Sequence, residues 1–501
     1  MNDHVEETEN DGDKRKLNVS KPKRVATEIE GLDAVLEGGF PVGQTCLVRG
    51  DSGSGKTTLA MQFCMAGARG GERVLFLSMC ETEEELRAMA RSHGWSLDGV
   101  VIHYHDVRER LGGRVNQSVF RPAEVELPQT IDALLSVIDE VNPERLVIDS
   151  LSELRIAAGD ARWFRHQMLA LKDYLIERHC TALFTSSSRV PEMGVKSLVH
   201  GMVELEQLAR EYGADRRRLR VHKLRRQTYA SGYHDFAIRT GGVEVYPRLI
   251  AAEHRAPFRP EIVRSGVPEL DELAGGGLDR GAATLLLGPS GSGKSTVATQ
   301  YVVAAAQRGE RAAMYIFDER PQTLLERSRG MGLHLQEPFE NGTVELQQVD
   351  PAELTPGEFS HAVHRAVVQR GIRMVVIDSL IGYVHAMPNE RLLTLHLHEL
   401  LTYLSQQGVT VLLVMSQHGL PGTPRHTPFD LSYISDSVLL FHIFEYAGEL
   451  RKAISMYKRR CGRHEQTLRP LQFGPQGISL GSHLQEYAGI LTGVAQRHEE
   501  G

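Results

Sequence analysis

The sequence lacks several features that mark particular classes of protein. Its 501 residues include only five cysteines, an odd number with no CxxC pair, which argues against a disulfide framework or a zinc site and predicts reduced thiols. No apolar run, Val411–Met415 being among the longest, approaches the ~20 residues that cross a bilayer. Without an apolar signal-peptide core near the N-terminus, we expect a cytoplasmic protein with no membrane partner. The cysteines are Cys46, Cys64, Cys80, Cys180 and Cys461.

An excess of positive charge is also missing. The formal net charge is −7, so the chain as a whole does not attract nucleic acid or anionic lipid. Hydrophobic residues make up 41% and charged residues 24%, which excludes a wholly disordered chain. At ~100–200 residues per domain, the length predicts two to four domains.

The chain contains a long internal repeat. The segment LDAVLEGGFPVGQTCLVRGDSGSGKTTLA starts at Leu32, and LDELAGGGLDRGAATLLLGPSGSGKSTVA starts at Leu270, an offset of 270−32 = 238. The later segments LVIDSL and VVIDSL repeat with an offset of 378−149 = 229. A period of this length indicates a duplicated domain and not a solenoid unit.

The repeat divides the chain into five predicted parts. We expect a flexible polar tail over residues 1–25, a first domain over 26–247, a proline-containing linker over 248–261, a second domain over 262–480 and a C-terminal segment over 481–501. In the last segment, apolar residues between Leu484 and Val494 recur at helix-like spacing and predict a short helix.

Each copy carries a complete GxxxxGK[ST] motif between an apolar run and a helical pattern. Strand, glycine-rich loop and helix is the context in which this motif binds phosphates, through backbone amides and the helix N-terminus. A glycine-rich turn without function is the alternative, and two complete matches at one offset disfavour it. The predicted nucleotide-binding residues are Gly50, Asp51, Ser52, Gly53, Ser54, Gly55, Lys56, Thr57 and Thr58, and Gly288, Pro289, Ser290, Gly291, Ser292, Gly293, Lys294, Ser295 and Thr296.

Residues for Mg²⁺ and for water activation follow from position in the repeat. Thr57 and Ser295 offer a hydroxyl to the metal, and Asp149 and Asp378 end apolar runs at the sheet edge where α/β proteins bind ligands. Glu81 and Glu319 stand 25 residues after their lysines (81−56; 319−294) and are candidate bases. An ordinary strand-end aspartate and an acidic helix start are the competing interpretations.

With these residues the chain resembles the KaiC family of two-domain RecA-superfamily ATPases. The resemblance covers residues 26–480 and depends on LDxxxxGG before the loop, an acidic pair after the next strand, the IDSL strand and a late basic strand. It implies an α/β fold of two tandem RecA-like P-loop NTPase domains, each a mostly parallel twisted sheet flanked by helices. It also implies ATP and Mg²⁺ as ligands.

The resemblance assigns roles to further residues. The family's pair of glutamates, the first taken as general base, matches Cys80-Glu81 and Asp318-Glu319, so we expect the first domain to hydrolyse ATP slowly. The family forms hexameric rings in which a neighbour's basic pair completes each site. The matching residues are Lys223 and Arg225 in the first domain and Lys458 and Arg460 in the second. A basic edge strand that prevents aggregation is the alternative.

The resemblance also bears on protein kinase activity. The family's adjacent autophosphorylated Ser and Thr match Ser432 and Tyr433, so only single-site autophosphorylation, on Ser432, stays open beside a plain loop serine. We therefore expect an ATPase in a homo-hexameric ring that acts as a signalling switch on an unidentified protein partner, with serine/threonine autokinase activity as an open question. A RecA- or DnaB-like nucleic-acid motor is disfavoured by few cations in the loops after Ser186 and Ser416. A non-catalytic nucleotide-gated scaffold is the third hypothesis.

Overall fold

The computed structural model describes residues 23–106, 122–158, 160–187, 195–209, 213–385, 390–417, 433–485, 487–490 and 496–497. Its internal contacts divide the chain into two compact units, residues 1–206, 220–231 and 238–244 and residues 207–219, 232–237 and 245–501. The domain boundaries at residues 247 and 262 stay a prediction. Within the described part of the chain, no helix has the length and hydrophobicity needed to span a membrane.

The first repeat is built on a nine-stranded sheet with the order β11-β10-β9-β8-β3-β7-β6-β4-β5. The strands from β8 to β5 run parallel to their neighbours. The strands are β3 (Thr45–Gly50), β4 (Val74–Ser78), β5 (Val100–Tyr104), β6 (Arg145–Asp149), β7 (Thr181–Ser187), β8 (Gly201–Leu208), β9 (Arg216–Leu224), β10 (Tyr233–Arg239) and β11 (Gly242–Tyr246), with β1 (Arg24–Val25) and β2 (Phe40–Pro41) as a separate pair. The helices are α1 (Glu30–Val35), α2 (Lys56–Arg69), α3 (Glu83–Ser92), α4 (Pro122–Val141), α5 (Leu151–Ala158), α6 (Ala161–Glu177) and α7 (Val195–Leu198).

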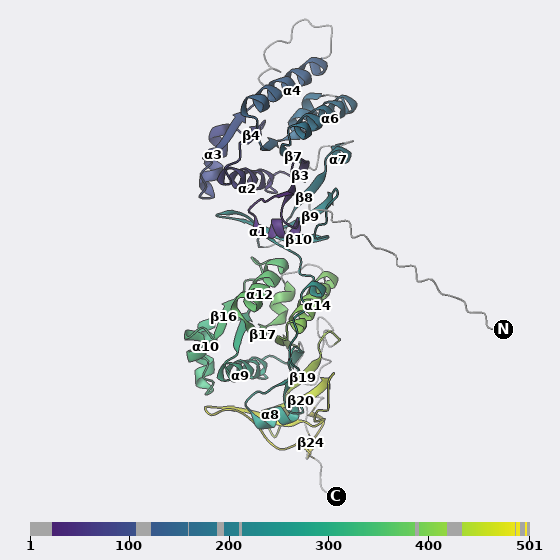
Figure 1. Ribbon diagram of the computed structural model, residues 1–501. Helices are drawn as coiled ribbons and strands as arrows, with labels where there is room; N and C mark the ends of the chain where they lie inside the picture. The colour runs from purple at the N-terminus through teal and green to yellow at the C-terminus, as the bar shows by residue number, and fades with distance from the viewer. Residues whose placement is uncertain are drawn as a thin grey trace, which may run out of the picture. The chain divides into compact units, whose positions relative to one another are not determined.

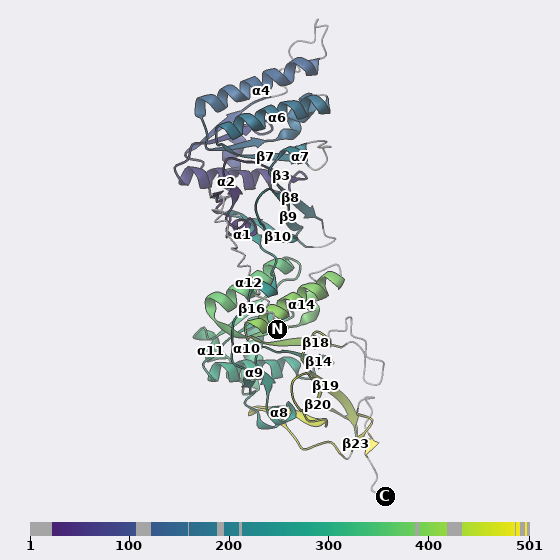
Figure 2. The same cartoon turned by 45° about the vertical axis from the view of Figure 1, so that its right-hand side comes forward.

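Helices flank the sheet of the first repeat, which explains why its central strands are mostly apolar. β4 and β6 are buried at every residue, as expected for parallel strands covered on two faces. Alternate residues such as Leu75, Leu77 and Ile148 pack with α4, α5 and α6. The helices α4 and α6 lie along one side of the sheet (Figures 1 and 2). The helix α2 packs against β3, β4, β6 and β7.

The second repeat has a nine-stranded sheet with the order β16-β15-β17-β18-β14-β19-β20-β21-β22. Its strands are parallel from β16 to β19 and antiparallel from β19 to β22. The strands are β14 (Ala283–Gly288), β15 (Arg311–Ile316), β16 (Val344–Gln348), β17 (Ile372–Asp378), β18 (Thr410–Ser416), β19 (Ser437–Tyr446), β20 (Glu449–Arg459), β21 (Arg469–Gly474) and β22 (Gly477–Leu480), with β12 (Ile262–Val263) pairing with β13 (Leu278–Asp279). The helices are α8 (Pro268–Leu273), α9 (Lys294–Gln307), α10 (Pro321–Gly330), α11 (Gln336–Glu340), α12 (Pro356–Arg370), α13 (Leu380–His385) and α14 (Glu390–Gln406), with a 3₁₀ turn η1 (Ala251–Glu253) before them.

The sheet of the second repeat separates two apolar clusters. Residues such as Met314 and Val376 face α8, α9 and α10, whereas their neighbours Tyr315 and Val375 face α12, α13 and α14. The helices α9 and α12 accordingly lie on opposite sides of the sheet in Figure 1. Two tandem mostly parallel sheets with flanking helices confirm the predicted fold class.

The prediction of a helix in the C-terminal segment is wrong. The described residues there form two short strands, β23 (Tyr487–Ala488) and β24 (Gln496–Arg497), which pair antiparallel. Gly489 takes a φ of 78°, which interrupts a helix. The apolar residues instead pack one by one, Tyr487 against Tyr446 and Ile490 in a cluster with Phe444.

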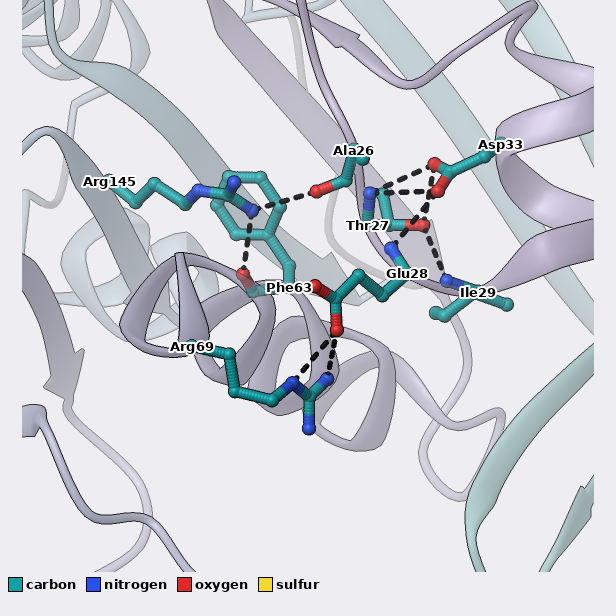
Figure 3. Close-up of polar contacts among 8 residues, drawn as sticks. All are labelled: Ala26, Thr27, Glu28, Ile29, Asp33, Phe63, Arg69 and Arg145. Carbon is teal, nitrogen blue, oxygen red and sulfur yellow. Dashed lines mark hydrogen bonds and ion pairs between the residues drawn. The ribbon is translucent and has the colours of Figure 1, made fainter. Parts of the chain in front are cut away.

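A buried arginine ties together the elements around the first nucleotide loop. The guanidinium of Arg145 on β6 forms a two-point ion pair with Glu72 and donates to the carbonyls of Ala26, at 2.8 Å, and Phe63 on α2, at 3.1 Å. Figure 3 shows the contacts with the two carbonyls, beside the Asp33 carboxylate that binds the turn at residues 27–28. Arg145 thereby fixes the chain before α1 and the middle of α2 against the sheet.

In the second repeat the matching glutamate is also paired with a buried arginine, but this arginine comes from a different position in the chain. Glu310 matches Glu72 (310−238 = 72), but Met374 stands where the first repeat has Arg145 (374−229 = 145). Glu310 is paired instead with Arg280, which follows β13 and is almost completely buried. The two copies thus conserve the anchored glutamate and differ in the source of the guanidinium.

Candidate active site

Both phosphate-binding loops end at a glycine that begins a helix. Gly55 and Gly293 are the N-cap residues of α2 and α9, with φ of 98° and 103°. This left-handed region favours glycine because it has no Cβ. At Gly293 a Cβ would also lie 2.0 Å from Cζ of Phe473. The strand–loop–helix context predicted for both motifs is confirmed, and it directs the helix N-terminus at the loop, where an anion is stabilised.

The lysines of the two motifs are folded onto their own loops. Lys294 Nζ donates to the carbonyl of Gly288 at 2.9 Å and to that of Pro289 at 2.7 Å. Lys56 Nζ donates to the carbonyl of Asp51 at 2.8 Å. Burial lowers the pKa of Lys294 to about 8 and also lowers the pKa of Lys56. A bound phosphate would therefore replace carbonyl partners and restore the preference for the charged ammonium.

The predicted hydroxyl and carboxylate ligands meet in both repeats. Thr57 Oγ1 donates to one oxygen of Asp149 at 2.7 Å, and the hydroxyl of Thr185 donates to the other. In the second repeat the side chain of Ser295 hydrogen-bonds the carboxylate of Asp378. Both aspartates are at least nine-tenths buried. These oxygen-only sets at a sheet edge fit Mg²⁺, which prefers one or two carboxylates together with phosphate oxygens.

Several charges act on Asp378. Burial raises its pKa to about 6, the Ser295 hydrogen bond opposes this, the charges of Glu319 and Asp318 add to it, and the charge of Arg327 opposes it. The neighbouring carboxylates thus oppose ionisation of Asp378, which a bound cation would favour.

The residues matched to the family's acidic pair are held differently in the two repeats. The hydroxyl of Ser379 donates to Asp318 at 2.5 Å, and Glu319 forms an ion pair with Arg327 at 2.5 Å. In the first repeat the matching thiol of Cys80 lies 3.8 Å from the Ser150 hydroxyl.

Glu81 is the single carboxylate at the matched positions of the first repeat. Within the described residues, one of its side-chain oxygens is buried without a hydrogen-bond partner. Burial raises its pKa, Asp149 and Glu85 raise it further, and Lys56 lowers it. The structure therefore brings Glu81 close to the predicted nucleotide and metal ligands.

A cavity of about 400 Å³ collects the predicted residues of the second repeat. Most of the phosphate loop lines it together with Asp318, Glu319 and Asp378, so the second-repeat candidates for metal and water meet most of those for nucleotide in one place. The sequence reasoning missed eight lining residues, among them the polar, charged or aromatic side chains of Ser379, Arg327, Lys452 and Phe473, which could contact a ligand.

Comparison with known proteins identifies the family. A family model described as "ATPase: KaiC" matches residues 25–250 and 263–485. The chain belongs to the KaiC family of ATPases. It is 25% identical over 500 residues to the circadian clock oscillator protein KaiC of Acaryochloris marina, covering 97% of this chain and 93% of the relative. It is 26% identical to the circadian clock protein KaiC3 of Synechocystis sp., covering 94% of each.

The basic residues that the KaiC resemblance assigns to a neighbouring subunit contact their own chain here. Lys223 donates to the carbonyls of Lys196 and Val199, and Arg225 donates to that of Ser197. Lys458 Nζ donates to the carbonyl of Ser435 at 2.7 Å, and Arg460 forms an ion pair with Asp436 at 2.9 Å. None of the four is among the described residues that line the second-repeat cavity. Their role across a subunit interface stays a prediction.

The predicted phosphorylation site cannot be placed, because Ser432 lies outside the described residues. Its neighbour Tyr433 is described and exposed, and its carbonyl accepts a hydrogen bond from Arg460. The loop residues 188–194 and 418–432, whose scarcity of cations argues against a nucleic-acid motor, are likewise outside the described part. Both expectations stay predictions.

Proposed function

We propose that this KaiC-family ATPase binds MgATP at both repeats and hydrolyses it chiefly at the second. The observation that carries the proposal is the second-repeat cavity, in which Lys294, Ser295 and Asp378 adjoin the carboxylates Asp318 and Glu319. Hydrolysis requires phosphate binding, charge neutralisation and a group that orients or deprotonates water, and this cavity offers all three.

The parts of the proposed site have separate tasks. The loop amides and Lys294 bind the β- and γ-phosphates, and Ser295 with Asp378 would hold Mg²⁺, whose charge neutralises the phosphate oxygens. Asp318 or Glu319 would accept the proton of the attacking water. At the first repeat Glu81 alone is available for this task, since Cys80 offers a thiol whose pKa is raised, mainly by burial. Slower turnover there is therefore expected.

The experiment is phosphate release by the full chain and its lysine variants. Lys294→Ala should remove most turnover, whereas Lys56→Ala should leave most of it and abolish nucleotide binding at the first repeat. If Lys56→Ala abolishes turnover and Lys294→Ala does not, the assignment of the two repeats is reversed. A parent chain that binds adenine nucleotide without releasing phosphate would instead favour the non-catalytic scaffold.

We further propose a homo-hexameric ring in which the basic pairs act across subunits. Two variants can test this in mixture, because their defects would lie on different chains. Lys294→Ala chains and Arg460→Ala chains should each be nearly inactive alone, and a mixture should regain part of the turnover. Light scattering with and without MgATP gives the number of subunits. A mixture that regains nothing, together with a monomeric mass, contradicts the proposal.

The regulatory role and autokinase activity are the finer parts of the proposal. The relatives named above carry circadian clock names, and from this likeness we infer a nucleotide-driven switch with a protein partner. Incubation with γ-labelled ATP tests the kinase: label on the parent chain that is lost in Ser432→Ala identifies the acceptor. Label that persists in Ser432→Ala, or that never appears, removes Ser432 from this role.

A further inference from the structure

The helices that follow the second strand of each repeat superimpose in sequence without a gap. The helix α3 spans Glu83–Ser92 and α10 spans Pro321–Gly330, both at the offset of 238. Two chemically important positions around them differ in the same comparison. The first repeat has Cys80 and Met89 where the second has Asp318 and Arg327. The second site has thus gained one carboxylate and one cation relative to the first.

The gained cation is engaged with the acidic pair. Arg327 reaches Glu319 at 2.5 Å with one nitrogen and the Thr296 hydroxyl at 3.3 Å with another. Arg327 and Glu319 are each about one quarter exposed, and both line the cavity. In the first repeat, Met89 leaves the matching Glu81 without such a partner.

Charge counting at the two exchanged positions shows what is preserved. Cys80 and Met89 carry no formal charge, whereas Asp318 and Arg327 carry charges of opposite sign, so the exchange itself adds no net charge to the site. A triphosphate carries several negative charges, and each uncompensated carboxylate in a partly buried site disfavours its entry.

We propose that Arg327 is a positioning residue of the second site: it holds Glu319 at the cavity wall and supplies the charge that lets this site carry two carboxylates and still bind ATP. The inference rests on the proposed function, because it takes the second cavity to be the nucleotide site. It assigns Arg327 a role through Glu319 and not through direct contact with the phosphates.

The test uses binding of a fluorescent ATP analogue with Mg²⁺ in a Lys56→Ala chain, so that the second site alone is observed. Arg327→Met should weaken binding about tenfold, and Arg327→Lys should recover part of the loss because it keeps the charge. The decisive variant is Arg327→Met with Glu319→Gln, which removes one charge of each sign and should return the affinity to within about threefold of the parent. Arg329→Met, on the same helix and exposed, is the matched control and should change nothing.

The outcomes separate this inference from the proposed function. If the double variant binds as weakly as Arg327→Met, the arginine acts on the nucleotide itself and the inference is wrong. If Arg327→Met binds like the parent, or Arg329→Met loses as much, it is also wrong, while the second site stands. If the Lys56→Ala chain takes up no nucleotide at all, the proposed function fails first.

A reciprocal experiment applies the same logic to the first repeat, observed in a Lys294→Ala chain. Cys80→Asp adds the carboxylate without its cation and should weaken nucleotide binding there. Cys80→Asp with Met89→Arg should restore it. A double variant that binds no better than Cys80→Asp contradicts the inference, since Met89 lies at the position of Arg327 by the offset of 238.

Discussion

Replacing Gly67 by alanine should destabilise the first repeat, although the same change stabilises an ordinary helix. Gly67 lies inside α2, where alanine is favoured over glycine by up to about 1 kcal/mol. A Cβ at Gly67, however, would lie 2.6 Å from Cδ of Arg145 and 2.9 Å from a methyl carbon of Val74. Arg145 cannot move aside without giving up its contacts with Glu72 and with the Ala26 carbonyl.

The magnitude follows from these contacts. Overpacking a dense core costs about 1–3 kcal/mol, and each buried hydrogen bond that is lost adds about 1 kcal/mol. With one hydrogen bond lost and the helix propensity subtracted, Gly67→Ala should reduce the free energy of unfolding of the first repeat by about 1–3 kcal/mol. This corresponds to roughly 5- to 150-fold faster amide exchange wherever exchange requires the repeat to open.

The second repeat shows which residues accommodate alanine at the position of Gly67. It has Ala305, Ala312 and Met374 where the first has Gly67, Val74 and Arg145. The cost of Gly67→Ala should therefore fall in an Arg145→Met chain and disappear when Val74→Ala is added.

The assay is hydrogen exchange by mass spectrometry on peptides from residues 56–69 of the full chain, which avoids treating two repeats as one unfolding transition. Ala305→Gly, followed on peptides from residues 294–307, serves as the comparison and should show only the ordinary loss of helix propensity. If Gly67→Ala slows exchange in the parent, or costs the same in all backgrounds, the steric argument is refuted.

Two further predictions concern the second site. Burial lowers the pKa of Lys294 to about 8, and the protonated form binds phosphate, so affinity for MgATP should be constant below this pH and fall by up to tenfold per pH unit above it. Calorimetry between pH 7 and 9.5 in a Lys56→Ala chain measures this affinity. An affinity that stays constant to pH 9.5 contradicts the assignment of Lys294 as a phosphate ligand. Ser379→Ala should lower steady-state turnover about tenfold by releasing Asp318. Ser150→Ala, which removes the hydroxyl beside the Cys80 thiol at the matched place, should change turnover less than twofold; equal losses would show that neither serine acts through the acidic pair.

The fold and the core of the site follow from the sequence because their signals are local. The two GxxxxGK[ST] motifs, the apolar runs before them and the strand ending at Asp378 each lie within about ten residues, and the internal repeat confirms the pattern. The position of Glu319 follows from counting along the repeat. These inferences need only the periodicity of helices and strands and the chemistry of phosphate binding.

Other parts depend on contacts between distant segments, which no local pattern reports. Lys452 and Phe473 reach the second cavity from β20 and β21, far along the chain from its motifs. The helix predicted in the C-terminal segment failed because Tyr487 and Ile490 pack against the distant residues Tyr446 and Phe444, and Gly489 between them takes a positive φ. Arg327 could have been found from the sequence, because the offset of 238 that relates the two helices places it at the position of Met89.

The anchored glutamate near each nucleotide loop has a consequence for chimeras of the two halves. Transplanting α9 into the first half would bring Ala305 against the guanidinium of Arg145, and transplanting β17 alone would leave Glu72 without its arginine. An exchange keeps the glutamate paired with an arginine only when it moves the loop after β13, the helix α9 and the strand β17 together. The two halves share one architecture, but a single element exchanged between them would not find the side-chain partners that it needs.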